Sequence, residues 1–255
     1  SIITAYNTSY TNQTKSMAEA YGEVISNTIR SLTLEIESAA NDSAAFDSTI
    51  PLVTRQKNLS KLAETALFKD YSVAYENGTT YNDTDLSDRE YFQKALNGQV
   101  AISAPVIRKT DGTVTTMMAA PAQCNGQKYV IYGGLDTSMF SNGLDKIDMG
   151  TGSNIVIFDN HGQVIASSDL EIVTSLTNYL ESDNQSMKKL AEKTMSGESG
   201  TYRYNDGRNN MLAYYMPLDG TDGWTIAVSG NYDQVLGSVL LDLGIAVGVS
   251  LALIC

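Results

Sequence analysis

The spacing of apolar residues predicts that the chain begins with a long helix. Residues 9–40 contain one glycine, Gly22, and no proline. Apolar residues recur there at intervals of three or four, at Ile25, Ile29, Leu32 and Ile36. This spacing places them on one face of a helix, which is expected to end at the polar residues 41–43. We expect the apolar face to pack against a sheet of the same chain.

The next stretch alternates helical and strand patterns. A second helix is expected after Pro51, and a shorter one over residues 88–97 with capping side chains from residues 86–88. Strands are expected between turn sequences that carry Asn-Gly or Asp-Gly pairs. These strands cover residues 71–75, 99–109, 113–123 and 128–136. Antiparallel strands flanked by helices predict an α+β lobe.

A similar order of patterns returns in the second half of the chain. Residues 138–147 are expected to form a connecting helix, and the Gly-Thr-Gly sequence at 150–152 a flexible joint. A helix is expected over residues 186–195, and strands over residues 154–158, 163–167, 200–204, 211–216 and 224–229. In each half a strand ends in an apolar residue and a proline, Pro121 or Pro217. This weak duplication predicts two sheet lobes along one long helix.

The C-terminal residues 235–255 are almost continuously apolar, with Asp242 as the main interruption. A membrane-spanning helix needs ~20 apolar residues, so we expect this stretch to begin a transmembrane helix. The alternative is a buried C-terminal helix, and the charged Asp242 keeps this alternative open. The abrupt start at Ser1 fits a fragment cut just after a first membrane span.

Composition argues against several classes of function. The 255 residues carry a net charge of −12, and no run of lysines and arginines forms a basic patch. Binding to nucleic acid or to an anionic membrane surface demands such a patch, so we expect neither. The two cysteines, Cys124 and Cys255, are poorly placed for a disulfide and have no zinc-type spacing.

No catalytic constellation is present in the sequence. The single histidine, His161, lies in a predicted turn, and no Gly-x-Ser-x-Gly sequence accompanies it. Asp83, Asp85 and Asp88 are spaced roughly like the start of a calcium loop, but the glycine and glutamate that such a loop needs are missing. We therefore expect no enzyme activity, no cofactor and no metal site.

Residues 83–136 contain side chains that could bind a small charged molecule. Arg89, Tyr91 and Phe92 lie at the predicted short helix, and Asp136 follows the last strand of the first lobe. An arginine can hold a carboxylate through two hydrogen bonds, aromatic rings can cover a ligand, and an aspartate can pair with an ammonium group. Taken singly, Arg89 is better explained by a salt bridge and Tyr91 and Phe92 by core positions, whereas Asp136, at the end of a buried strand, must find a partner.

The order of these motifs resembles the membrane-distal half of a double Cache (dCache) sensor domain. The motifs are Asp-Leu-Ser-Asp-Arg-Glu-Tyr-Phe at 85–92, Ile-Ser-Ala-Pro at 102–105 and Gly-Gly-Leu-Asp at 133–136. The resemblance runs from the first helix to Gly230. It implies an α+β fold in which a long N-terminal stalk helix carries two PAS-like antiparallel-sheet lobes. It also implies the extracytoplasmic ligand-binding module of a bacterial chemoreceptor, sensor kinase or cyclic-dinucleotide enzyme.

The resemblance also implies roles for individual residues. The amino-acid-binding subset of the family carries Arg-x-Trp-Tyr, an upstream tyrosine and a later aspartate. By position, Arg89 would bind a carboxylate, Tyr91 and Phe92 would supply the rings, and Asp136 would bind an ammonium group. Phe92 lacks the hydroxyl of that pattern, and the upstream tyrosine position falls on Thr84. The further candidates are Tyr81, as the nearest ring, and Ser103, as a polar wall residue. An amino acid, a carboxylate, an amine, a short peptide and a nucleobase-like metabolite all remain open as ligands.

We therefore expect the extracytoplasmic sensor domain of a receptor in the cell membrane, with a chemoreceptor favoured. Its expected parts are a stalk (residues 1–50), a membrane-distal ligand-binding lobe (51–147), a membrane-proximal lobe (148–231) and a helix entering the membrane (232–255). Its expected partners are a small metabolite, the membrane through the flanking helices, and a second copy through the stalk helix. The alternatives are a surface adhesion module without a pocket, or the sensor of a histidine kinase or diguanylate cyclase.

Overall fold

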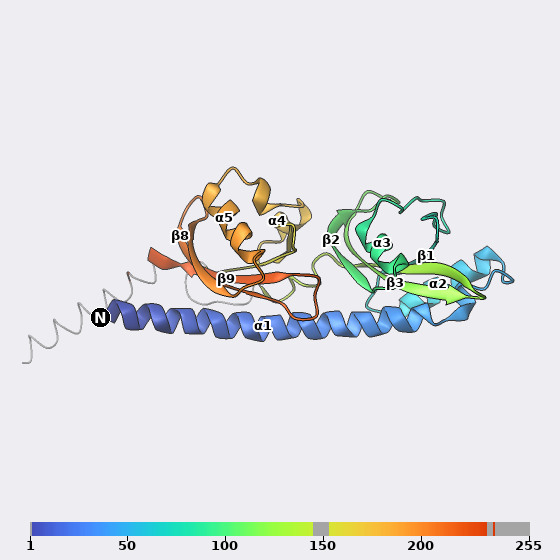
Figure 1. Ribbon diagram of the computed structural model, residues 1–255, viewed down its shortest axis with the longest axis horizontal. Coiled ribbons are helices and arrows are strands. Elements are labelled where there is room, and N and C mark those ends of the chain that lie inside the picture. Colours follow the sequence, from blue (N-terminus) through green and yellow to red (C-terminus); the bar gives the residue numbers. More distant parts are fainter. Residues whose placement is uncertain (1, 145–152, 234–236, 238–255) are drawn as a thin grey trace, which may run out of the picture.

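A single long helix, α1 (Ile2–Ala40), runs beside two sheet lobes (Figure 1). The computed structural model describes residues 2–144, 153–233 and 237. The predicted apolar stripe of α1 is confirmed, since Ile25, Ile29, Leu32 and Ile36 are buried. The helix has 39 residues, which corresponds to about 58 Å at ~1.5 Å per residue. It is therefore long enough to pack against both lobes.

The first lobe contains a four-stranded antiparallel sheet in the order β1-β4-β3-β2. Its elements are η1 (Ser43–Ala45), α2 (Leu52–Glu64), β1 (Asp70–Tyr75), α3 (Glu90–Leu96), β2 (Ala101–Ile107), β3 (Val114–Cys124) and β4 (Gln127–Leu135). Neighbouring residues of a strand point to opposite faces, so the sheet has two different surfaces. One face, with Val73 and Ile131, joins the core shared with α1. The other, with Val130 and Tyr132, packs with α3 residues.

The second lobe contains a five-stranded antiparallel sheet in the order β6-β5-β9-β8-β7. Its elements are β5 (Asn154–Phe158), β6 (Val164–Ser167), α4 (Leu170–Thr174), η3 (Tyr179–Glu181), α5 (Gln185–Thr194), β7 (Gly200–Asn205), β8 (Asn210–Pro217) and β9 (Thr225–Asn231). This sheet packs along the N-terminal part of α1, and the first sheet along its C-terminal part (Figure 1). The predicted α+β fold with two antiparallel-sheet lobes is confirmed. We call the two lobes distal and proximal by their distance from the N-terminus of α1.

The two lobes are in direct contact with each other. The Phe140 ring packs edge-on against Trp224, with ring centroids 5.5 Å apart. Gln163 of the proximal lobe donates a hydrogen bond to the carbonyl oxygen of Pro105 on β2, at 2.7 Å. The lobes thus form one continuous body in which a change in one can reach the other.

Three local predictions were wrong. Residues 138–143 form successive turns, such as Met139 N–H to Asp136 O at 2.9 Å, where a helix over 138–147 was expected; residues 145–147 lie outside the described part of the chain. The N-cap of α3 is Arg89, without a side-chain cap, because the Asp88 carboxylate binds Lys109 instead. The short helix α4 was not predicted; it is capped by the Asp169 carboxylate, which accepts the Glu171 N–H at 3.0 Å.

Two expectations fall outside the described residues. The Gly-Thr-Gly joint at 150–152 is one of them, as is the transmembrane helix expected over 235–255. Among the helices that the structure describes, none combines the length and the apolar character needed to span a bilayer.

Candidate ligand-binding site

The candidate site lies on the face of the distal sheet that packs with α3, on the side opposite α1. Cross-strand pairing places Asp70 of β1, Gly134 of β4 and Met117 of β3 in one row. Tyr132 lies on the same face as Gly134, because side chains alternate along a strand. The residues of this row come from three strands, of which β1 is far from β3 and β4 in the sequence.

A cavity opens over this row, between α3 and the segments on either side of it. It is lined by Thr84, Leu86, Arg89, Tyr91, Val106, Ile107, Arg108, Lys109, Thr110, Met117 and Tyr132. Its volume is only about 20 Å³, which is room for roughly one water molecule. The site is therefore closed by its own side chains, and any larger ligand must move them.

Three hydrogen bonds hold the cavity closed. Arg89 donates from Nη2 to the carbonyl oxygen of Ile107, at 3.0 Å. Lys109 Nζ donates to the carbonyl oxygen of Asp85, at 2.8 Å, and to Asp88 Oδ1, at 2.5 Å. These bonds join residues 84–89 to residues 107–110 across the cavity mouth. Because all three are exposed or nearly so, they can exchange with water at small cost.

What we call the floor of the site is an ion pair between Arg108, which lines the cavity, and Asp70, which is outside the lining. Arg108 Nη1 lies 2.7 Å from Asp70 Oδ2, and Asp70 Oδ1 accepts the Gly134 N–H at 3.1 Å. Burial acts to lower the pKa of Arg108, but the hydrogen bond and charge of Asp70 outweigh it and the pKa is raised. Arg108 is therefore a permanent cation whose charge is balanced by Asp70.

Two tyrosines form the walls beside this floor. Tyr91 and Tyr132 are 6% and 5% exposed. Burial raises the pKa of Tyr91 to about 12. Burial also raises the pKa of Tyr132, against the opposing hydrogen bonds with Ser72 and Thr80. Both phenols stay neutral at ordinary pH and present a ring face together with a hydroxyl group.

The structure brings some of the predicted site residues together and separates others. Arg89 and Tyr91 line the closed cavity. Ser103 lies in an adjoining cleft, where its Oγ accepts the Met117 N–H at 2.9 Å. Phe92 is 1% exposed and packs with the core between α3 and the sheet.

The other two predicted residues lie away from the cavity. The Tyr81 hydroxyl accepts a hydrogen bond from Arg55 at 2.9 Å and donates one to Ala45 O at 2.8 Å. Asp136 is exposed, pairs with Lys69 at 3.2 Å and accepts the Ser138 N–H at 2.9 Å. Hydrogen bonds from the Ser138 hydroxyl and N–H lower the pKa of Asp136, so it remains a carboxylate that caps a turn.

Sequence patterns alone do not single out Asp70, Arg108 or Tyr132. Their convergence depends on which residues of β1, β3 and β4 lie opposite one another. Strand alternation could have placed Tyr132 and Gly134 on one face. The sequence alone does not show which residues of β1 and β3 lie opposite Tyr132 or Gly134.

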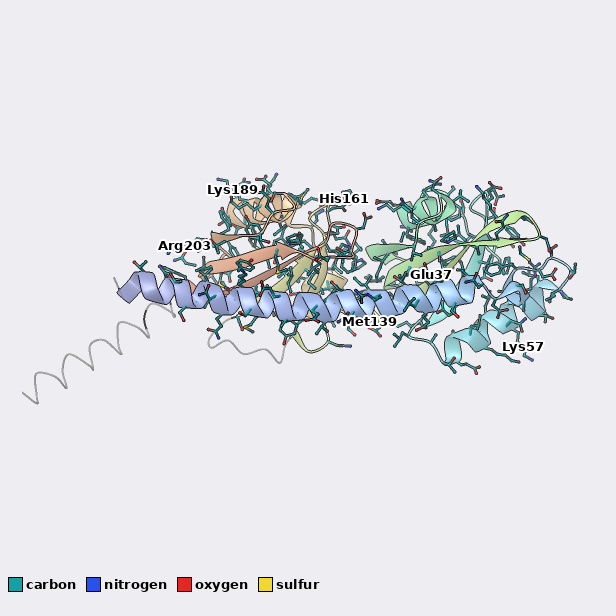
Figure 2. The ribbon with its side chains drawn as sticks, turned by 60° about the horizontal axis from the view of Figure 1, so that its bottom comes forward. Glu37, Lys57, Met139, His161, Lys189 and Arg203 are labelled. Atoms are coloured by element: carbon teal, nitrogen blue, oxygen red, sulfur yellow. The ribbon has the colours of Figure 1, made fainter. Side chains whose placement is uncertain are left out.

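The adjoining cleft lies between the lobes and has a volume of about 370 Å³. Arg89 and Tyr91 line it from the distal side, and His161 and Trp224 from the proximal side. His161 is on the proximal lobe, at the side that faces the distal lobe (Figure 2). Buried Asp159 also lines the cleft; burial raises its pKa, although N–H donors from Gln163 and His161 act to lower it. Since Arg89 and Tyr91 border both spaces, the cleft is the natural way into the closed cavity.

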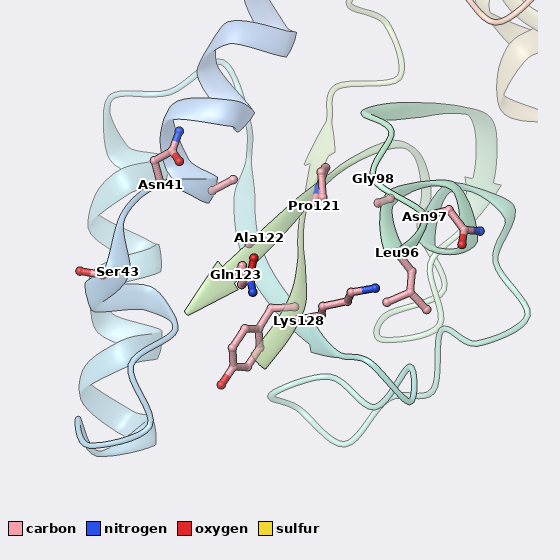
Figure 3. A pocket seen from close by; sticks show the side chains of 12 residues that line it. Asn41, Ser43, Leu96, Asn97, Gly98, Pro121, Ala122, Gln123 and Lys128 are labelled. Atoms are coloured by element: carbon pink, nitrogen blue, oxygen red, sulfur yellow. The ribbon is translucent and has the colours of Figure 1, made fainter. Parts of the chain in front are cut away.

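A third cavity, of about 490 Å³, lies at the far end of the distal lobe (Figure 3). It is bordered by the ends of α1 and α3 and by the β3–β4 hairpin, with Asn41, Leu96, Gln123 and Lys128 among its lining residues. Lys128 is the one ionisable group in it besides the Tyr129 phenol. It offers no combination of charge and aromatic rings like that around Arg89.

The corresponding face of the proximal sheet is filled by its own side chains. Phe158 packs against Tyr179 with ring centroids 5.0 Å apart, and Tyr215 and Ala191 belong to the same buried cluster. Within the described ranges, no three histidine, cysteine or acidic side chains are grouped so as to hold a metal ion. The distal lobe is therefore the better candidate for ligand binding.

A family model described as a Cache domain, dCache_1, matches residues 2–239. The chain belongs to this double Cache family, as the order of its motifs predicted. A comparison with curated proteins found no significant match.

Solved structures with a similar fold include sensor domains of chemoreceptors and of histidine kinases. The ligand-binding domain of the Pseudomonas fluorescens chemoreceptor CtaA, in complex with L-isoleucine, has a TM-score of 0.70 at 19% identity and covers 92% of this chain and 98% of its own. The sensory domain of the Campylobacter jejuni chemoreceptor Tlp3, with isoleucine bound, has a TM-score of 0.64 at 12% identity and covers 91% and 96%. An extracellular domain assigned to a histidine kinase, rpHK1S-Z16, has a TM-score of 0.69 at 15% identity and covers 88% and 95%. At these identities the likeness establishes the fold.

Proposed function

We propose that this chain is the extracytoplasmic sensor domain of a bacterial transmembrane receptor and that it binds a small metabolite in its distal lobe. Membership of the double Cache family supports the general class. Chemoreceptors and a histidine kinase both occur among the structures with this fold, and the proposal covers both. That the receptor is a chemoreceptor remains a prediction of the sequence analysis.

The observation that carries the proposal is the arrangement of Arg89 at the mouth of the distal cavity. Its guanidinium donates to a neutral backbone carbonyl, beside two buried tyrosines. A ligand carboxylate makes stronger, charge-assisted hydrogen bonds than a carbonyl does, so it can displace Ile107 O and open the closed site. Binding then favours an arrangement of residues 84–89 and 107–110 that differs from the one seen here.

A thermal-stabilisation screen tests the proposal. Amino acids, carboxylates, amines and nucleobases would be added singly, and the unfolding temperature of the chain measured. A ligand present at about 100 times its dissociation constant adds ~2.7 kcal/mol to the free energy of unfolding, which is readily detected. Stabilisation that is lost in Arg89→Gln but kept in Arg208→Gln, an exposed arginine of the proximal lobe, supports the proposal. Failure of every compound would favour a module without a ligand, such as an adhesion domain.

A further inference from the structure

We infer that the distal cavity selects an organic monocarboxylate with an apolar or aromatic body and disfavours the corresponding amino acid or amine. This inference rests on the proposed function and specifies its ligand class. It follows from how the charges around the cavity are already paired.

The first observation concerns the free positive charge. Of the three cations that line the cavity, Arg108 is paired with Asp70 and Lys109 with Asp88. Arg89 has no carboxylate within ion-pair distance in the part of the chain that the structure describes. Its guanidinium has a fixed fork of N–H donors that matches the two oxygens of a carboxylate. Arg89 is thus the lining cation that gives up no carboxylate partner when an anionic ligand binds.

The second observation concerns the acids, because an ammonium group needs a carboxylate to receive it. Both oxygens of Asp70 are engaged, one by Arg108 and the other by the Gly134 N–H. Asp136 is engaged outside the cavity by Lys69 and Ser138. If an ammonium took Asp70, the Arg108 guanidinium, 15% exposed, would keep only the more distant Asp111, at 3.9 Å, as a counter-ion. Taking the closer partner from a largely buried guanidinium is unfavourable.

The third observation concerns the remaining lining. Leu86, Val106 and Met117 supply aliphatic surface, and the Tyr91 and Tyr132 rings complete the wall. Such a lining gains free energy by covering an apolar body and loses it by covering an unpaired ammonium. Arg89 lies at the mouth, so the carboxylate would bind there with the body directed toward Met117.

Matched compounds that differ only in one charged group test this inference. One set is 4-methylpentanoate, L-leucine and 3-methylbutylamine, which share a branched skeleton. The other is 3-phenylpropanoate, L-phenylalanine and 2-phenylethylamine. Affinities for the whole chain would be measured by titration calorimetry. In at least one set we expect the carboxylate to bind at least tenfold more tightly than the amino acid, and the amine to show no binding.

Two variants and one control variant separate the roles of the charges. Arg89→Gln should weaken binding of the carboxylate at least tenfold, and Arg208→Gln should leave it unchanged. Asp70→Asn keeps an acceptor for the Gly134 N–H and removes the negative charge that balances Arg108, so it should not weaken binding of the carboxylate.

Three outcomes overturn the inference. Tighter binding of an amino acid or amine than of its carboxylate is one, and loss of that binding in Asp70→Asn would identify Asp70 as the ammonium acceptor. Absence of binding in both sets is another, because the inference requires a carboxylate of this kind. A third is carboxylate binding that Arg89→Gln leaves intact. In each case the proposed function would still hold if a compound of another class bound the distal lobe and stabilised the chain.

Discussion

Lys94 of α3 forms an ion pair with Asp222, in the loop that precedes β9 of the proximal lobe. It is also paired with Glu90 on its own helix, at 2.7 Å. Burial acts to lower the pKa of Lys94, but the two carboxylates outweigh it and the pKa is raised. Helix α3, which carries Tyr91 and has Arg89 as its N-cap, is thus tied to the proximal lobe through Lys94, about one turn after Arg89. A ligand that moves Arg89 therefore acts on a helix that both lobes hold.

The first prediction concerns this connection between the lobes. The Lys94 and Asp222 side chains are 30% and 54% exposed, and pairs of this kind contribute ~0.2–1 kcal/mol. A double-mutant cycle with Lys94→Ala and Asp222→Asn should give a coupling energy in that range in chemical denaturation. Lys189→Ala, on the proximal lobe (Figure 2), should show no coupling to Asp222→Asn. A coupling energy of zero for Lys94 would mean that this pair does not join the lobes in solution.

The second prediction compares two adjacent glycines of β4. A Cβ on Gly133 would lie 2.6 Å from the backbone oxygen of Asp70, whereas one on Gly134 would lie 3.1 Å from Thr115, 3.2 Å from Asp70 Oδ1 and 3.4 Å from Arg108. The contacts at Gly134 are with side chains that can give way. We expect Gly133→Ala to lower the free energy of unfolding by ~1–3 kcal/mol and Gly134→Ala to cost less.

Ligand binding should show the opposite order for these two glycines. Gly134→Ala pushes against the Asp70–Arg108 pair at the floor of the site, so it should weaken binding of the ligand found by screening. Gly133→Ala, on the opposite face of the sheet, should weaken binding only to the extent that it destabilises the folded chain. If Gly134→Ala binds as tightly as the natural chain does, the floor of the site is not at Gly134.

The third prediction concerns alkaline pH. Burial raises the pKa of Tyr91 and of Tyr204 to about 12, above the usual ~10 of an unfolded chain. Each phenol therefore contributes stability that is fully present below pH 10 and is lost as the pH rises from 10 toward 12, because the unfolded state loses its proton first. Unfolding temperatures measured from pH 8 to 11.5 should fall steeply above pH 10. Tyr91→Phe should make that fall shallower, and an unchanged slope would contradict the assignment.

The sequence predicted the fold better than the site. The periodicity of α1 and the continuous apolar run of β5, at residues 155–158, are local properties that a chain shows before it folds. Arg89 and Tyr91 were found because they lie close together in one motif. Arg108 and Asp70 were not, because their contact depends on how β1, β4 and β3 align across the sheet. Asp136 has the same strand parity as Gly134, but β4 ends at Leu135 and the following turn directs the carboxylate outward.

The sequence also could not predict how the lobes meet. Contacts such as Lys94 with Asp222 join residues that are 128 positions apart, and no periodic pattern relates them. Closure around a ligand should also pull on the connection at residues 136–147, of which residues 145–147 lie outside the described part of the chain. The α3 contact is a second route that only the folded structure shows.

The most direct test of a ligand site in the distal lobe is hydrogen exchange along the chain, with and without saturating 4-methylpentanoate or the compound that stabilises the chain most. Our account predicts changed exchange in residues 84–92 and 106–110, with smaller changes at residues 220–224 across the Lys94 contact, and no such changes in Arg89→Gln. Changes confined to the proximal lobe, or to the cavity beside Asn41 and Lys128, would contradict it.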